Sequence, residues 1–189
     1  MAAAKKGGPL QHAGLRGRLG DLGSIDPEYD VAITTCCGML DYIVVDTPEG
    51  GQACINFLRE KNIGRANFVV LEQAGQYRAG MERSQALTLP TGSRRVLDLV
   101  TPSDPSLLPV FYMALRDTLV AKDLDSAVAM AYQGGRPVWK VVTLDGNLID
   151  NSGSMSGGGK QARSGGMRLS GTAAPRAITA EIEEVRSSL

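Results

Sequence analysis

The chain has 189 residues, of which 43% are hydrophobic and 21% charged, enough for one globular domain or two small subdomains with a buried core. Its 20 basic and 20 acidic side chains cancel, so no overall field directs it to nucleic acid or to a membrane, and no apolar run approaches the roughly 20 residues that span a bilayer. Three cysteines and one histidine suit neither a disulfide framework nor a zinc site, so we expect a soluble intracellular protein without a metal or other cofactor.

The first half predicts alternating helices and strands. Residues 1–16 are small and non-periodic, which indicates a poorly ordered tail, and the glycines that follow indicate a turn-rich segment. Asp26 and Thr47 stand where N-caps are expected. The predicted elements are a helix at 27–39, a buried strand at 42–45, a helix at 48–61 and a second strand at 67–71.

The second half repeats this order after a connection. Residues 73–94 are polar and contain glycine and proline, which predicts a long surface connection, and residues 95–100 resume strand character. The elements expected next are a helix at 109–115, a strand at 118–121, a helix at 123–132 and a strand at 139–144. In the last helix one apolar face is predicted to hold Leu124, Ala127, Val128 and Ala131.

A weak internal repeat follows from this order. The segment LDYIVVDTPEGGQA of the first half resembles RDTLVAKDLDSAVA of the second. We therefore predict two similar α/β subdomains within residues 17–160, at about 17–72 and 95–160, joined by residues 73–94. Chance similarity within a common α/β pattern stays open as the alternative.

The C-terminal part changes character. Residues 161–175 form a basic linker rich in glycine and serine, within a Gly/Ser-rich stretch that begins at 151. Over residues 176–189, apolar side chains then recur at steps of four, three and four residues: Ile178, Ile182, Val185 and Leu189. This spacing predicts the start of a coiled-coil helix, and an ordinary terminal helix explains it equally well.

The most informative stretch carries four glycines in the spacing G-x6-G-x3-G-G: Gly146, Gly153, Gly157 and Gly158. Glycine permits positive φ and close approach of another backbone, which predicts a sheet edge that accepts a strand from a second chain. A flexible linker, a phosphate loop and a dinucleotide fingerprint are the alternatives. The Walker pattern is broken, because Ser154 stands at its first glycine and Gln161 follows Lys160.

This glycine spacing resembles the signature of hinge domains of structural maintenance of chromosomes (SMC) proteins, of the condensin-type large subunit. The blocks that carry the resemblance span residues 17–159: GRLGDLGSIDPEYDVAI, LDYIVVDT, CINFLREKNIGRANFVVLE, FYMALRDTLVAKDLDSAVAMAY and WKVVTLDGNLIDNSGSMSGGG. The resemblance implies a mixed α/β hinge fold of two subdomains at the apex of a coiled coil. It also implies that the four glycines line the interface with a different SMC hinge.

The resemblance further implies a nuclear, chromosome-organising protein whose full length is an ABC-type ATPase. The ATPase motifs are absent here, so we expect a fragment without enzymatic activity. The only histidine, His12, falls in the predicted tail, and Asp145 and Asp150 suit turns better than catalysis. The alternative function is a small α/β enzyme that binds a nucleotide or small molecule through the glycine loop.

Basic residues cluster at both ends of the predicted domain. Lysines and arginines precede the first acid, Asp21, and others lie in the acid-free residues 151–180. If the two ends lie together, they form a positive patch for weak, sequence-independent DNA binding; two solvated tails are the alternative. The candidate DNA contacts are Arg16, Arg18, Lys160, Arg163 and Arg168.

Overall fold

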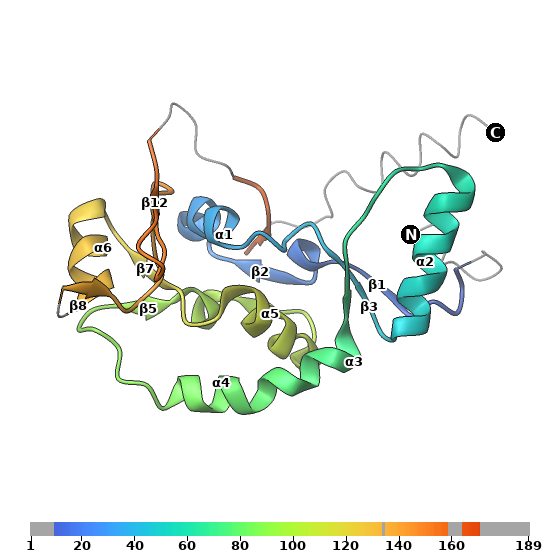
Figure 1. Ribbon diagram of the computed structural model, residues 1–189, viewed down its shortest axis with the longest axis horizontal. Helices are drawn as coiled ribbons and strands as arrows, with labels where there is room; N and C mark the ends of the chain where they lie inside the picture. Colours follow the sequence, from blue (N-terminus) through green and yellow to red (C-terminus); the bar gives the residue numbers. More distant parts are fainter. Residues whose placement is uncertain (1–9, 134, 159–163, 171–189) are drawn as a thin grey trace.

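The computed structural model describes residues 10–133, 135–158 and 164–170. It has a small sheet toward each end of its long axis, with helices between them (Figure 1). The first sheet has the order β1-β3-β4: β1 (Leu15–Arg18), β3 (Ile43–Val45) and β4 (Phe68–Val70). The second has the order β12-β11-β10-β7-β5: β5 (Arg94–Arg95), β7 (Leu119–Ala121), β10 (Val141–Thr143), β11 (Leu148–Ile149) and β12 (Met155–Ser156).

The predicted order of helix, strand, helix and strand occurs twice. In the first half α1 (Asp30–Cys36) precedes β3, α2 (Pro48–Lys61) and β4; in the second α5 (Leu108–Leu115) precedes β7, α6 (Leu124–Ala131) and β10. Both strand pairs are parallel, as a connecting helix requires. The crossover helices also begin alike, because the side chains of Thr47 and Asp123 each accept a hydrogen bond from the N–H three residues on.

The two halves share one hydrophobic core. Val44 of the first sheet, Val142 of the second and Phe111 of α5 belong to a single buried cluster. Helix α1 of the first half packs against β10 of the second. The Nζ atom of Lys140 also donates to the carbonyl oxygen of Cys36 at the end of α1, over 3.1 Å. Most of the buried apolar side chains of both halves therefore belong to one shared cluster, and each half adds a smaller cluster of its own.

Residues 71–85 are helical, which corrects the prediction of a surface connection over this part of the chain. The segment consists of α3 (Leu71–Ala74), the 3-10 turn η4 (Gly75–Tyr77) and α4 (Arg78–Gln85). Ala74 and Ser84 are buried, and Leu71, Tyr77 and Met81 pack partly buried against the core cluster. Charged residues and two glycines separate these apolar side chains in sequence, so the segment lacks the continuous apolar stripe on which the sequence prediction relied.

Two further details differ from the sequence prediction. Residues 96–99 form a 3-10 turn, η5 (Val96–Leu99), closed by a hydrogen bond from the N–H of Val100 to the carbonyl of Leu97 over 3.2 Å, so the strand predicted at 95–100 ends at Arg95. In α6 the inner face is formed by Ala127 and Ala131, which are fully buried. Leu124 and Val128 are 42% and 39% exposed, contrary to the predicted apolar face.

A third sheet of order β13-β2-β6 joins three distant parts of the sequence: β2 (Gly23–Ile25), β6 (Thr101–Pro102) and β13 (Arg168–Leu169). The described part of the predicted tail is ordered: Leu10 and Ala13 are buried beside Val45 and Cys54. Strand β13 falls within the predicted linker. The predicted coiled-coil start and residues 1–9 lie outside the described residues.

The remaining elements are short. They are the 3-10 turns η2 (Leu19–Asp21), η3 (Pro27–Tyr29) and η6 (Pro105–Leu107), and the hairpin of β8 (Tyr132–Gln133) and β9 (Arg136–Pro137). The predicted helix at 27–39 is therefore a 3-10 turn capped by Asp26 that continues into α1. No helix in the described ranges is long and apolar enough to cross a bilayer.

Candidate dimerisation interface

Two of the four candidate glycines build hairpin turns. Gly146 has a φ of 89° in the turn from β10 to β11, and its N–H donates to the carbonyl of Thr143 over 3.1 Å. Gly153 has a φ of 93° in the turn from β11 to β12, and its N–H donates to the carbonyl of Asp150 over 2.9 Å. Residues other than glycine rarely adopt such φ values. Both positions therefore require glycine for the turns of this chain, independently of any partner.

Asp145 and Asp150 serve these turns. The Asp150 carboxylate accepts the N–H of Ser152 over 2.9 Å, which lowers its pKa. Asp145 accepts from the hydroxyl of Thr143 and from the amide of Asn147. Neither acid faces a catalytic partner among the described residues, and the turns join strands and open no helix, unlike a phosphate loop.

The other two glycines follow β12. A Cβ atom on Gly157 would lie 2.1 Å from Oδ1 of Asn147, so this glycine lets the chain pass closely over the turn between β10 and β11. Gly158 has a φ of 76°, and a Cβ there would meet nothing within 4 Å. Of these two glycines, Gly158 has no described residue close to its Cβ position, whereas Gly157 has a contact that the sequence did not reveal.

Strand β12 is an open edge of the second sheet. The Ser154 carbonyl accepts from Asp150 over 2.8 Å, and hydrogen-bonding direction alternates along an antiparallel strand, so the peptide groups of Met155 and Gly157 point away from β11. Within the described residues β12 has no neighbour on that side. Met155, which the sequence analysis did not single out, is 52% exposed and is the only apolar side chain in residues 151–158.

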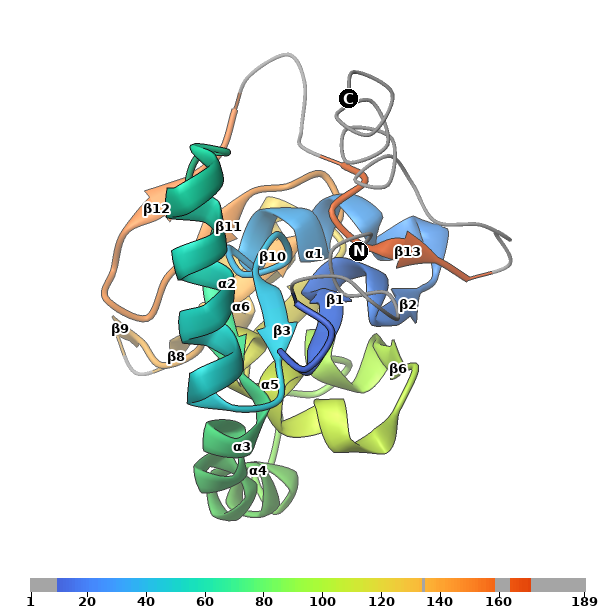
Figure 2. The same cartoon turned by 90° about the vertical axis from the view of Figure 1, so that its right-hand side faces the viewer.

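A second open edge lies in the other sheet. Strand β4 pairs only with β3 among the described strands, and an apolar groove of about 260 Å³ runs beside it. Tyr42, Phe68 and Met113 line this groove together with neighbours from α3 and η4. The sheets that carry β4 and β12 lie toward opposite ends of the molecule (Figure 1). Figure 2, turned by 90°, shows α2 crossing in front of the first sheet.

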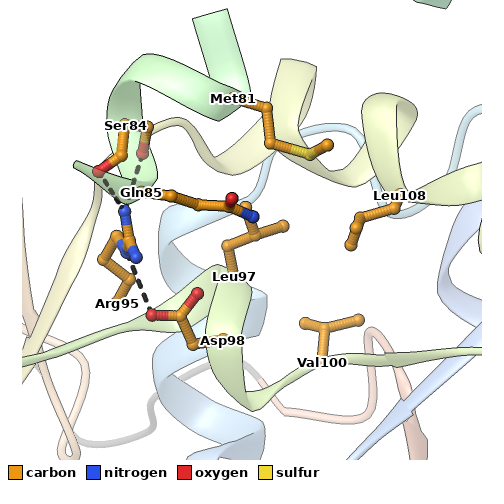
Figure 3. Close-up of a pocket in the computed structure, with 8 residues that line it drawn as sticks. All are labelled: Met81, Ser84, Gln85, Arg95, Leu97, Asp98, Val100 and Leu108. Atoms are coloured by element: carbon orange, nitrogen blue, oxygen red, sulfur yellow. Dashed lines mark hydrogen bonds and ion pairs between the residues drawn. The ribbon is translucent and has the colours of Figure 1, made fainter. Parts of the chain in front are cut away.

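A smaller cavity of about 160 Å³ lies between α4 and η5 (Figure 3). Its buried Arg95 donates through Nε to Asp98 over 2.9 Å and through Nη1 to the carbonyl of Ser84 over 2.5 Å. The hydroxyl of Ser84 in turn contacts Asp117. The guanidinium is thus bound within the chain and fastens α4 to the core, so we assign this cavity a structural role.

The described basic candidates do not form a free cluster. Hydrogen bonding to Asp46 over 2.7 Å raises the pKa of Arg16. Burial alone would lower the pKa of Arg18, and hydrogen bonds to Asp21 and Asp41 outweigh it and raise the pKa. Arg168 is exposed on β13. This strand pairs with β2, which follows Arg16 and Arg18 closely in sequence. Lys160 and Arg163 lie outside the described residues.

The cysteines offer no nucleophile. All three are buried, and burial raises the pKa of Cys36 to about 12, so its thiol is protonated at neutral pH. Within the described ranges no three side chains of His, Cys, Asp or Glu are grouped as metal ligands.

Comparison with known proteins identifies the family to which the chain belongs. The family model of the SMC proteins Flexible Hinge Domain matches residues 12–131. The chain belongs to this SMC hinge family. Structural maintenance of chromosomes protein 4 of Homo sapiens is 48% identical over 163 residues, which are 86% of this chain and 12% of that protein. The Saccharomyces cerevisiae protein of the same name is 47% identical over 156 residues, 82% of this chain and 10% of its own length.

Solved hinge structures agree with this assignment. An asymmetric dimer of the Geobacillus stearothermophilus SMC hinge domain matches with a TM-score of 0.59 and 27% identity, over 78% of this chain and 60% of that one. The Pyrococcus furiosus SMC protein hinge domain shares the fold, with a TM-score of 0.57 at 22% identity, over 94% of this chain and 86% of that one. The mixed α/β hinge fold and the condensin-type resemblance predicted from sequence are confirmed.

Proposed function

We propose that this SMC hinge is a dimerisation module that joins a condensin-type SMC protein to the hinge of a different SMC subunit. The observation that carries the proposal is a pair of open strand edges of opposite character in one chain. Strand β12 carries no charged side chain and is followed by two glycines, whereas β4 lies beside an apolar groove. Open edges of this kind bind strands of other chains.

The arrangement of the edges suggests how two hinges join. If β12 of each hinge lies along β4 of the other, the same contact forms twice, and two contacts toward opposite ends close a ring. Met155 is then the apolar side chain that enters the partner's groove, and Gly158 is the position where the partner backbone approaches. Gly146, Gly153 and Gly157 hold the hairpin in the required shape.

The role in the cell follows from the same assignment. As a hinge, the chain holds two SMC subunits together during chromosome condensation in the nucleus, and it catalyses no reaction itself. We include weak, sequence-independent DNA binding through Lys160, Arg163 and Arg168, whose charges no acid in residues 151–180 offsets. Arg16 and Arg18 contribute less, because carboxylates already neutralise them.

The test places one charge on the open edge. Met155→Glu should weaken binding to a partner SMC hinge at least tenfold, about 1.4 kcal/mol, because the carboxylate loses water on assembly. Light scattering of the mixed hinges measures assembly, and circular dichroism measures the fold. Ile55→Glu is the matched control, since Ile55 is 46% exposed on α2 and belongs neither to an edge strand nor to the lining of the groove. If both variants bind the partner hinge equally well, β12 is not part of the interface.

A further inference from the structure

Residues 164–170, which we call the strap, return to the domain after β12 and close the third sheet. Leu169 of the strap pairs with Ile25 of β2 in parallel, and the N–H of Ser170 donates to the Ile25 carbonyl over 2.7 Å. Met167, the strap's one buried apolar side chain, is 3% exposed and belongs to the core cluster that contains Phe111. Leu169 is partly buried and packs against the same cluster, so two apolar side chains dock the strap in the core.

Glycines on both sides make this docking possible. A Cβ on Gly20 would lie 2.0 Å from the carbonyl oxygen of Gly166, and a Cβ on Gly23 would lie 2.8 Å from Cε of Met167. A Cβ on Gly166 itself would lie 2.7 Å from Leu40. Two backbones thus touch directly where the C-terminal part of the chain passes the N-terminal part.

Helix α1 supplies the remaining contacts. The N–H of Gly165 donates to both carboxylate oxygens of Asp30 over 2.9 Å, and the N–H of Gly166 donates to the hydroxyl of Thr34 over 3.1 Å. All these contacts of α1 are made to backbone N–H groups. They fix the path of the strap without contributing buried apolar area.

We propose that the strap is a releasable latch, which undocks while the rest of the hinge stays folded. One buried and one partly buried apolar side chain, a two-residue strand pairing and the hydrogen bonds to α1 must offset the conformational entropy of seven ordered residues, so the docked state is only slightly favoured. The core sheets do not depend on the strap, because β13 lies at the edge of its own sheet and pairs with β2 alone.

The latch controls where the chain leaves the domain. When docked, the chain leaves beside β2, a few residues along from β1, where the N-terminal segment enters the first sheet. When undocked, residues 164–170 are free of the core. The direction of the C-terminal segment relative to the N-terminal one is then no longer fixed.

Hydrogen exchange of the unchanged chain tests this latch. The amides of Gly165, Gly166 and Ser170 should be protected relative to a free peptide, yet exchange at least tenfold faster than the amide of Val142 in β10. Gly166→Ala should accelerate exchange of Gly165 and Ser170 about tenfold further, because its methyl group meets Leu40. The Val142 amide should be unaffected.

Gly38→Ala is the control, since a Cβ at Gly38 meets nothing within 4 Å and should leave every rate unchanged. Strap amides that exchange as slowly as Val142 would show that the strap opens only with the whole fold. Strap amides at free-peptide rates would show that it is not docked. Either result, or equal acceleration of Val142 by Gly166→Ala, overturns the latch.

Discussion

The two strand–helix–strand units differ at the edge that each leaves open. Both gain an antiparallel strand beside their first strand, β1 on β3 and β5 on β7. The first unit then stops at β4, with Phe68 and its neighbours along a groove, whereas the second continues into the glycine hairpin of β11 and β12. The first unit thus exposes an edge strand, β4, with large side chains. The second exposes an edge strand, β12, that is followed by glycines and has few large side chains. Such strands are complementary, because small residues let a second backbone approach large neighbours closely.

The largest expected effect tests whether the units are independent. Phe111→Ala removes a fully buried ring from the shared core and should cost about 3–5 kcal/mol of unfolding free energy. Because Val44 and Val142 lie in the same cluster, chemical denaturation followed by circular dichroism and by Trp139 fluorescence should give one coincident transition. Leu124→Ala, at an exposed site, should change the unfolding free energy by less than about 0.5 kcal/mol. Two separated transitions would mean that each half has its own core.

A smaller effect separates the two glycines that follow β12. Gly157→Ala should destabilise the hinge by about 1–3 kcal/mol, because the methyl group overlaps Asn147. Asn147→Ala in the same chain should recover part of that loss, which a double-mutant cycle by thermal denaturation would measure. At Gly158 a methyl group meets no atom and only the positive φ opposes it, so Gly158→Ala should cost roughly 1 kcal/mol. Equal losses at both positions without rescue would contradict the Asn147 contact.

The smallest effect compares the equivalent caps of the crossover helices. Thr47→Ala should cost about 1 kcal/mol at any pH, because a hydroxyl does not titrate in the working range. Hydrogen bonding from the side chain and then from the N–H of Ser126 lowers the pKa of Asp123, so the contribution of Asp123 is fully present above its unfolded pKa of roughly 3.9. It is lost as the pH falls through the lower, folded pKa.

Denaturation of Thr47→Ala and Asp123→Asn at pH 7 and at low pH would measure this difference. The Asp123→Asn deficit should shrink in acid, whereas the Thr47→Ala deficit should stay constant. A constant deficit for both variants would show that Asp123 caps α6 without a charge-dependent part.

Local patterns predicted the repeated units, because the apolar runs at β3, β4, β7 and β10 and the caps at Thr47 and Asp123 are encoded over a few neighbouring residues. The spacing of the four glycines likewise pointed to a special sheet edge. The contacts that were missed join distant residues. Met167 lies in a stretch rich in glycine and serine, and it becomes a core residue only because the next residues, Arg168 and Leu169, pair with β2, more than a hundred residues earlier in sequence. The groove beside β4 combines side chains from β4, α3, η4 and α5, so no single stretch announces it.

Placing the open edges toward opposite ends of one chain has a consequence for how a closed pair separates. When one of the two contacts opens, the other still holds the partners, so the open edges remain near each other at an effective concentration in the millimolar range or above. Reclosure is then a fast unimolecular step, and full dissociation requires the second contact to open before the first reforms. If two hinges pair through both edges as proposed, one contact can therefore open while the other keeps the two chains together.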